Sequence, residues 1–195
     1  MKIVAATNNK GKLKELKAML SPYAQVLSLA DVNITGDVEE TGTTFEENAA
    51  LKAEYAYNIC RLPTIADDSG LEVDALNKEP GIYSARYAEI NGYNGHIIDF
   101  LLKKMDGIQD RSARFVCCIC FIDGDGNKQY FKGFTEGKIL LERDGDGGFG
   151  YDPVFFSNDL NKSFGKAEPD EKDKVSHRGR AIKELVKYME KKYGK

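Results

Sequence analysis

One stretch of the sequence is most informative about the fold of this chain, namely Leu62-Pro63-Thr64-Ile65-Ala66-Asp67-Asp68-Ser69-Gly70. An apolar run, typical of a buried strand, leads directly into two adjacent aspartates. Successive side chains of a strand point to opposite faces, so one of the two carboxylates must point toward the interior or a cleft. Adjacent like charges repel each other, and a neighbouring cation, usually a divalent one, relieves that repulsion. The stretch therefore predicts a strand that ends in a cation-binding acidic site.

Strand and helix patterns alternate on both sides of this stretch, which predicts a mixed α/β fold. Two overlapping capping boxes, Thr43 with Glu46 and Thr44 with Glu47, open one helix, and Ser176 is the expected N-cap of the last one. Strands are expected at residues 1–7, 24–29, 62–66, 113–122 and 128–134, the last two as a hairpin, with a strand or extended segment at 71–76. Helices are expected at residues 10–20, from the boxes to about 60, 94–105 and 176–193.

Length and charge limit the class of protein. The 195 residues suit a single domain, 1–195, with room for two lobes. A net charge of -3 gives no overall attraction to nucleic acid or to an anionic membrane. No apolar stretch approaches the ~20 residues of a membrane helix, and the N-terminus lacks the long apolar region of a signal peptide. We therefore expect a cytoplasmic protein without a nucleic-acid or membrane partner.

The four cysteines predict buried thiols rather than a metal site. They are Cys60, Cys117, Cys118 and Cys120, and three of them share one apolar strand. Neighbours on a strand point to opposite faces, so these three cannot share a tetrahedral zinc ion. The expectation is of small buried side chains in a reducing compartment.

Two helix starts carry positive charge where helices normally carry negative charge. Thr7-Asn8-Asn9-Lys10-Gly11-Lys12 lies between the first strand and the first helix, so its backbone N–H groups and lysines can face an anion. A second cluster, with Lys172, His177 and Arg178, surrounds the start of the last helix. Taken singly, each has a plainer interpretation, namely a solvated basic turn for the first and neutralisation by upstream acidic residues for the second. Together they favour a polyanionic ligand such as a nucleoside triphosphate.

Two further segments carry groups that suit such a ligand. Gly147-Gly148-Phe149-Gly150-Tyr151-Asp152-Pro153 offers ring faces to a planar ligand and a carboxylate to its edge, although a turn with aromatic core anchors is an equal alternative. Glu39-Glu40, with Asp67-Asp68, could complete an oxygen site for Mg²⁺, although an acidic surface before a helix explains Glu39-Glu40 alone.

As a set, the motifs resemble the inosine triphosphate pyrophosphatase family, the non-canonical purine nucleoside triphosphate pyrophosphatases or XTP/dITP diphosphatases. The resemblance runs nearly end to end and in order through residues 7–12, 39–49, 66–71, 80–87, 148–153 and 176–179. It implies an elongated central mixed β-sheet flanked by helices, and two lobes with a cleft between them. It also implies hydrolysis of ITP, dITP and XTP to the monophosphate and pyrophosphate, with Mg²⁺ as cofactor and a homodimer with Ser84–Tyr87 as an interface segment.

By position, the resemblance assigns roles to particular residues. Asp68 matches the catalytic base, and Glu40 and Asp68 match the metal ligands. The substrate contacts match Thr7, Asn8, Asn9, Lys10, Gly11, Lys12, Ser69, Phe149, Gly150, Tyr151, Asp152, Lys172, His177 and Arg178. Two alternatives stay open, a pyrophosphatase for other modified nucleotides and a non-catalytic nucleotide sensor. The more acidic run Arg143-Asp144-Gly145-Asp146-Gly147 departs from the family pattern and leaves the geometry of the following loop open.

Overall fold

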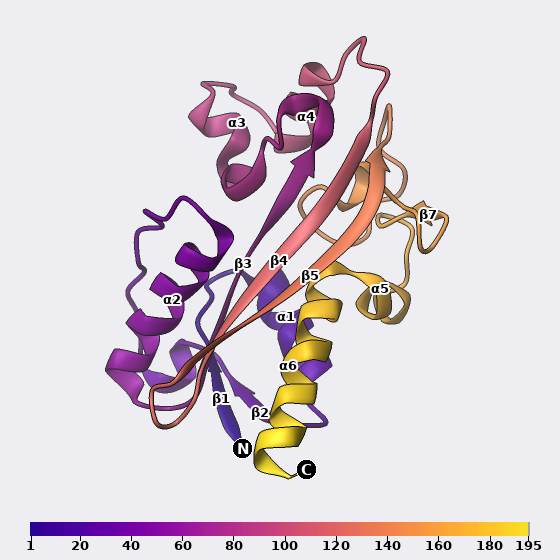
Figure 1. The fold of residues 1–195 in the computed structure, drawn as a ribbon. Helices are drawn as coiled ribbons and strands as arrows, with labels where there is room; N and C mark the ends of the chain where they lie inside the picture. Colours follow the sequence, from indigo (N-terminus) through magenta and orange to yellow (C-terminus); the bar gives the residue numbers. More distant parts are fainter. Residues whose placement is uncertain (195) are drawn as a thin grey trace. The chain divides into compact units, whose positions relative to one another are not determined.

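A mixed sheet of seven strands runs through the computed structural model, which describes residues 1–194 (Figure 1). The strands are ordered β2-β1-β3-β4-β5-β6-β7, with β1 parallel to β2 and β3, and β6 antiparallel to β5 and β7. Their bounds are β1 Lys2–Ala5, β2 Gln25–Leu27, β3 Thr64–Val73, β4 Ser112–Ile122, β5 Lys128–Ile139, β6 Phe155–Ser157 and β7 Lys162–Ser163. The helices are α1 Lys10–Leu20, α2 Phe45–Cys60, α3 Tyr87–Ile90, α4 Ile97–Lys104, α5 Pro169–Val175 and α6 His177–Tyr193. The predicted mixed α/β class is confirmed.

The chain divides into two compact units. The first comprises residues 1–68, 117–133 and the segment from Arg178 onward, and the second comprises residues 69–116 and 134–177. Strands β3, β4 and β5 each pass from one unit into the other, and the boundary on β3 falls directly after Asp68. The predicted site residues thus fall in both units, with Lys12, Asp67 and Asp68 in the first and Phe149, Asp152 and Lys172 in the second.

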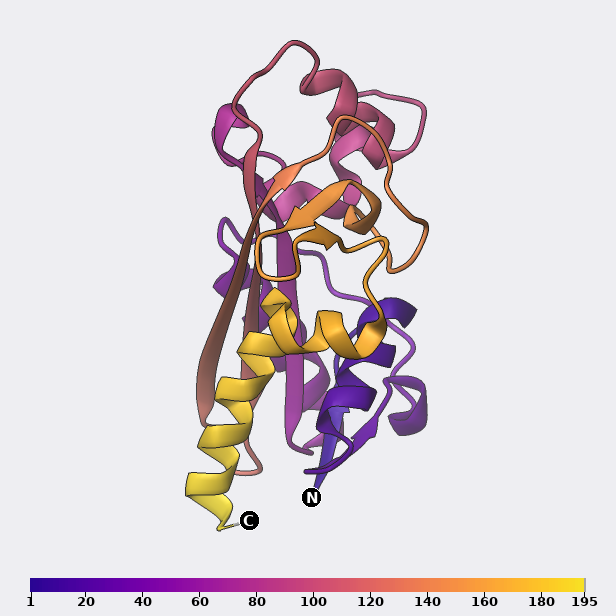
Figure 2. The same cartoon turned by 90° about the vertical axis from the view of Figure 1, so that its right-hand side faces the viewer.

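In the first unit, helices cover both faces of the sheet (Figure 1, Figure 2). Ile3 and Ala5 of β1 pack with α1 and α6, whereas Val4 packs with α2. This is the two-residue alternation of a strand that is buried on both faces. The predicted stripe of α6, formed by Ile182, Leu185, Val186 and Met189, is buried in the first of these cores. Each large aliphatic side chain that is fully buried contributes roughly 1.5–3 kcal/mol to stability.

Helix α2 begins after Thr44, the predicted N-cap of one of the two capping boxes. Thr44 is the N-cap, and its hydroxyl accepts a hydrogen bond from the Glu47 backbone N–H at 3.2 Å. The Glu47 carboxylate accepts from the Thr43 backbone N–H at 2.7 Å. The second box, Thr43 with Glu46, is wrong, because a helix has one N-cap and Glu46 instead pairs with Lys132 of β5.

The strand prediction around the two aspartates is also wrong at its end. Residues 62–66 were expected to form a strand that stops before Asp67, but β3 continues without interruption for ten residues to Val73. Asp67 and Asp68 thus lie in the middle of a buried strand. The strand tolerates both charges because they point to opposite faces, and each carboxylate meets at least one lysine there.

The second unit is built around an aromatic core. Phe115 of β4 lies between Phe155 and Phe164, with ring centroids 4.5 and 6.0 Å away. Helix α4 is shorter than the predicted 94–105, because the His96 side chain caps it by accepting from the Ile98 N–H at 3.2 Å. The sequence did not predict α5, which ends at Val175 and is separated from α6 by its C-cap, Ser176.

The predicted hairpin is confirmed in β4 and β5. At its turn the Asp123 carboxylate accepts from the backbone N–H groups of Asp125 and Asn127, both at 2.9 Å. Within residues 1–194, no helix combines the length and the apolar character needed to cross a bilayer.

Candidate functional site

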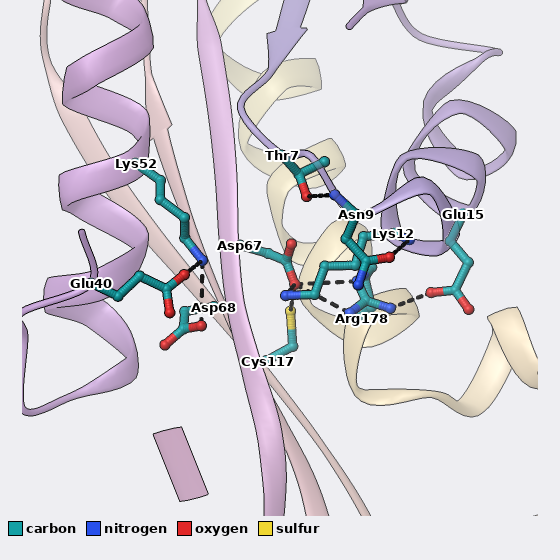
Figure 3. A network of polar contacts seen from close by, with 10 residues as sticks. All are labelled: Thr7, Asn9, Lys12, Glu15, Glu40, Lys52, Asp67, Asp68, Cys117 and Arg178. Atoms are coloured by element: carbon teal, nitrogen blue, oxygen red, sulfur yellow. Dashed lines mark hydrogen bonds and ion pairs between the residues drawn. The ribbon is translucent and has the colours of Figure 1, made fainter. Parts of the chain in front are cut away.

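Asp67 and Asp68 point to opposite faces of β3 in the first unit (Figure 3). Asp67 points to the face that α1 and α6 cover, and Asp68 points to the face that α2 covers. Both side chains are buried, with 2% and 4% of the residue exposed. One strand therefore supplies carboxylates to two separate polar clusters.

The first cluster joins Asp67 to the starts of two helices. The Oδ2 atom of Asp67 lies 3.2 Å from the Lys12 Nζ of α1. The same oxygen accepts hydrogen bonds from the Arg178 Nε and Nη2 of α6 at 3.3 and 3.2 Å. The other side of the Arg178 guanidinium pairs with Glu15, one turn after Lys12 on α1. The Cys117 thiol of β4 lies 3.9 Å from the same Asp67 oxygen. Three segments that are distant in sequence therefore meet at one carboxylate.

Charge in this cluster is balanced inside the protein. Burial would raise the pKa of Asp67, but Lys12, Arg178 and Lys52 outweigh it and hold that pKa well below its usual range. Asp67 is therefore ionised at neutral pH. The predicted convergence of the two basic helix starts is confirmed for Lys12 and Arg178. Their partners, Asp67 and Glu15, were not predicted from the sequence.

The loop before α1 is shaped by its own polar side chains. Asn9 is the N-cap of α1, and its Oδ1 atom accepts from the Lys12 backbone N–H at 3.1 Å. The Thr7 hydroxyl accepts from the Asn9 N–H at 3.1 Å. Asn8 and Lys10 are exposed, and Gly11 is half-buried. The predicted anion-binding segment thus lies at the positive end of an 11-residue helix.

The second cluster lies on the α2 face and contains Asp68, Glu40 and Lys52. The Lys52 ammonium lies 2.7 Å from a Glu40 oxygen and 3.4 Å from the Asp68 Oδ1. The Oδ2 atom of Asp68 is buried and has no hydrogen-bond partner within the described residues. The two predicted metal ligands are therefore brought together, with a lysine between them that the sequence analysis missed.

The pKa values of Asp68 and Lys52 are both raised. Burial is the main reason that the pKa of Asp68 is raised, and the attraction of Lys52 and Lys12 does not cancel it. Burial lowers the pKa of Lys52, but Asp68, Asp67 and Glu40 outweigh it, so the net shift is upward. Asp68 thus takes up a proton more readily than Asp67, which suits a proton acceptor.

In the second unit, the glycine-rich loop holds a buried ion pair. The Lys172 ammonium lies 2.7 Å from the Asp152 Oδ2 and 4.9 Å from the centroid of the Phe149 ring. The same Asp152 oxygen accepts from the Phe149 backbone N–H at 2.9 Å. Gly148 has a φ of 72°, and a Cβ atom there would collide with the Asp152 carboxylate. Three predicted substrate contacts, Phe149, Asp152 and Lys172, therefore form one cluster.

Two other predicted contacts in this unit are packed into the interior. Tyr151 is 4% exposed, and its hydroxyl donates to the Ser84 carbonyl at 2.7 Å. The His177 ring stacks on Phe115 at 4.8 Å and is 6% exposed. Ser69 is half-buried on β3, and Gly150 is exposed with a φ of 62°. Phe149 is thus the one aromatic ring of this loop that is partly exposed.

The predicted interface segment Ser84–Tyr87 is partly internal. Ser84 is 6% exposed, and its hydroxyl donates to the Gly81 carbonyl at 2.6 Å. Tyr87 is 2% exposed and donates to Glu79 at 2.8 Å. Ala85 and Arg86 between them are exposed. The role of this segment in a dimer stays a prediction.

Comparison with known proteins agrees with this arrangement. The model of the Ham1 family matches residues 3–188. A dITP/XTP pyrophosphatase from Staphylococcus epidermidis is 48% identical over 188 residues, which are 96% of each chain. The dITP/XTP pyrophosphatase of Christiangramia forsetii is 44% identical over 191 residues, 98% of this chain and all of that protein.

Solved structures show the same fold. The Ham1 protein of Staphylococcus aureus superimposes with a TM-score of 0.85 at 44% identity, over 97% of this chain and 98% of that one. A HAM1 protein from Coxiella burnetii gives a TM-score of 0.86 at 36% identity, over 98% of this chain and 99% of that one. This chain belongs to the Ham1 family.

Proposed function

We propose that this protein hydrolyses non-canonical purine nucleoside triphosphates, namely ITP, dITP and XTP, to the monophosphate and pyrophosphate. Relatives named dITP/XTP pyrophosphatases are 44–48% identical to this chain, and the identity extends over almost their whole length. The observation that carries the proposal is that the two adjacent aspartates of β3 have different partners. Asp67 binds two basic helix starts, and Asp68 faces Glu40 and Lys52. Strand β3 thus supplies the carboxylate proposed for hydrolysis, Asp68, and through Asp67 it holds the cations that α1 and α6 offer to a triphosphate.

Glu40 and Asp68 are the residues that would hold Mg²⁺. Mg²⁺ in phosphate-processing enzymes takes one or two protein carboxylates and fills its remaining positions with water and phosphate oxygens. The buried Asp68 Oδ2, which has no partner within residues 1–194, fits that requirement. When bound, the ion neutralises phosphate charge and makes a coordinated water more acidic.

Asp68 is the proposed general base. Its raised pKa brings the carboxyl closer to the working pH, where it takes a proton from water more effectively than an ordinary aspartate does. Asp67 cannot serve in this way, because Lys12, Arg178 and Lys52 hold its pKa low. Asp68→Asn should therefore lose several orders of magnitude in turnover and still bind nucleotide. Near-normal turnover in this variant would exclude the role.

Lys12 and the backbone N–H groups from Thr7 to Lys12 are the proposed site for the leaving pyrophosphate. The loop lies at the positive end of α1, and Lys12 is 15% exposed in its side chain, so it can reach a phosphate from its place beside Asp67. Lys12→Ala should weaken binding of the triphosphate far more than binding of the nucleoside. An equal loss for both ligands would argue against this assignment.

The second unit supplies the groups proposed to meet the base. Hypoxanthine and xanthine carry an N1–H group, whereas adenine has a bare N1. Asp152 can accept from that N–H, with the Phe149 ring against the base and Lys172 holding the carboxylate in place. A hydrogen-bond donor near His177 and Arg178 is proposed to meet the 6-oxygen. Asp152→Ala should then reduce the preference for ITP over ATP, and an unchanged preference would refute this assignment.

One assay separates this function from its alternatives. Pyrophosphate release is measured with ITP, dITP, XTP, ATP and GTP, and with methylated and pyrimidine triphosphates, with and without Mg²⁺. Release that is fastest with the non-canonical purines and depends on Mg²⁺ is the expected result. Binding without release would favour a nucleotide sensor, and faster release from pyrimidine or methylated nucleotides would favour the neighbouring class of pyrophosphatase.

We also propose that the protein acts as a homodimer in the cytoplasm. The homodimer is what the family resemblance implies, and a net charge of -3 gives no attraction that would hold the protein on nucleic acid. Light scattering on the purified protein, at concentrations across the micromolar range, tests the dimer. A mass that stays at one chain throughout would exclude it.

A further inference from the structure

Lys52 lies between the two carboxylates that we assign to Mg²⁺. Its ammonium is 2.7 Å from Glu40 and 3.4 Å from Asp68, and its side chain is 13% exposed (Figure 3). It comes from the middle of α2, on the same helix face as the buried Asn48 and Ala49. A lysine in this position is part of the sheet-facing side of the helix and not of its solvent-facing side.

The charges of this cluster are unequal. Two carboxylates share one ammonium, which leaves a formal excess of one negative charge if both are ionised. The ammonium is nearer to Glu40 than to Asp68, and the second oxygen of Asp68 has no partner among residues 1–194. Because an unpartnered buried carboxylate oxygen is costly, the cluster has capacity for more positive charge than Lys52 supplies.

We propose that Lys52 is a built-in counter-ion that a divalent cation must displace from Glu40 and Asp68. On this proposal, which rests on the proposed function, the protein takes up the metal ion together with a triphosphate and resists taking it up alone. Lys52 thereby sets the order of binding at the site.

The physical reason is repulsion between two cations at the same oxygens. A divalent ion on Glu40 and Asp68 would lie within a few ångströms of the ammonium, which must then move away. Lysine can do so because its charge lies at the end of four rotatable bonds. A displaced, largely buried ammonium is stable only beside another anion, and a phosphate oxygen provides one. Without the phosphate, metal binding has to offset that cost.

Binding of Mn²⁺ to the nucleotide-free protein tests the proposal. Free Mn²⁺ is measured by its electron paramagnetic resonance signal during titration of wild type, Lys52→Met and Lys132→Met. Lys132 is the matched control, because it also forms an ion pair with a glutamate of α2, Glu46, but on the exposed surface. Removal of the repulsion should lower the Kd for Mn²⁺ at least about tenfold in Lys52→Met. Lys132→Met should bind Mn²⁺ with the same Kd as wild type.

Further variants show that the gain arises at the proposed oxygens. Lys52→Met combined with Asp68→Asn should lose the tighter binding, and Lys52→Arg, which keeps the charge, should resemble wild type. If Lys52→Met does not fold, Lys52→Gln takes its place, because the amide still donates to Glu40. Mn²⁺ binding in the neutral variant that is no tighter than in wild type overturns the proposal.

A second titration examines the order of binding directly. The α,β-methylene analogue of ITP, which cannot be cleaved between its α and β phosphates, should tighten Mn²⁺ binding more in wild type than in Lys52→Met. An equal effect in both proteins would count against the exchange of cations. Failure of the proposed function is distinguishable, because it would appear as no pyrophosphate release from ITP while the nucleotide-free Mn²⁺ result stands unchanged.

Discussion

Loss of charge at the two adjacent aspartates should affect stability in different ways. Asp67 lies 3.2 Å from both Lys12 and Arg178 in a buried cluster. At that distance, and with an effective dielectric constant of about 20, each pair has a gross attraction of about 5 kcal/mol. Removing one partner of a buried pair typically costs about 3–5 kcal/mol. In Asp67→Asn, Glu15 still neutralises Arg178, and Lys12 is partly exposed. We therefore expect the free energy of unfolding to fall by about 3 kcal/mol, the lower end of that range.

Asp68→Asn should change the free energy of unfolding much less. The raised pKa of Asp68 means that the folded protein disfavours its ionised form, so ionisation costs stability at neutral pH. Asparagine removes that cost, and Lys52 keeps its closer partner, Glu40. The expected change is within about 1 kcal/mol in either direction.

Urea unfolding followed by far-ultraviolet circular dichroism measures both effects at pH 7. Glu184→Gln is the control, because Glu184 pairs with Lys187 on the exposed surface of α6. This substitution should change the free energy of unfolding by no more than about 0.5 kcal/mol. The lowered pKa of Asp67 adds a pH signature. Its contribution is complete above the unfolded pKa, near 3.9, and is lost as the pH falls through the lower folded pKa. Equal losses of unfolding free energy for Asp67→Asn and Asp68→Asn at pH 7 would show that the two carboxylates are not compensated differently.

Three other variants or reagents probe the rest of the chain. Gly148→Ala should lower kcat/KM for ITP at least about tenfold, because the added Cβ atom would collide with the Asp152 carboxylate. Gly107 has the same φ of 72° but open space around it, so Gly107→Ala should lower only the free energy of unfolding, by about 1 kcal/mol. At pH 8 a thiol reagent should modify only Cys60 in the folded protein, because the other three cysteines are buried and burial raises the pKa of Cys118 to about 12. Asp123→Asn should destabilise by about 1 kcal/mol at pH 7, and the difference should fade below pH ~4, because Lys192 and Asn127 lower the pKa of Asp123 despite its burial. Urea unfolding at several pH values measures this last effect.

Local patterns predicted most helices and strands, but they failed where tertiary contacts decide the structure. The helix at Lys10–Leu20 follows from its leucine spacing and the proline after it. The end of β3 was misplaced because two charges followed by Ser69-Gly70 look like the end of a strand. The cations that arrive from α1, α2 and α6 make a continuous strand tolerable there. Helix α5 was missed because its charged residues show no apolar period.

The candidate site was predictable in its positions and less so in its pairings. Basic helix starts signalled that Lys12 and Arg178 would meet an anion, and the structure brings them together at Asp67. Lys52 gave a signal that could have been used, since it shares the helix face of Asn48, Ala49, Ala53 and Ala56, which are all buried. A charged residue on an otherwise buried stripe needs a partner. Glu15 gave no such signal, because a glutamate three residues after a lysine on a helix is ordinary on any exposed surface.

Adjacency in sequence produces separation in space at Asp67 and Asp68. A strand sends neighbouring side chains to opposite faces, so two carboxylates one residue apart meet different cations and acquire pKa values that shift in opposite directions. Had the two carboxylates been two residues apart, they would share one face, and one would have to be protonated or bridged. The continuous backbone of β3 also fixes which aspartate faces which cluster, because a slip of one residue would exchange them. The strand therefore lets one carboxylate be held permanently as an anion while its neighbour stays open to a proton or a metal ion.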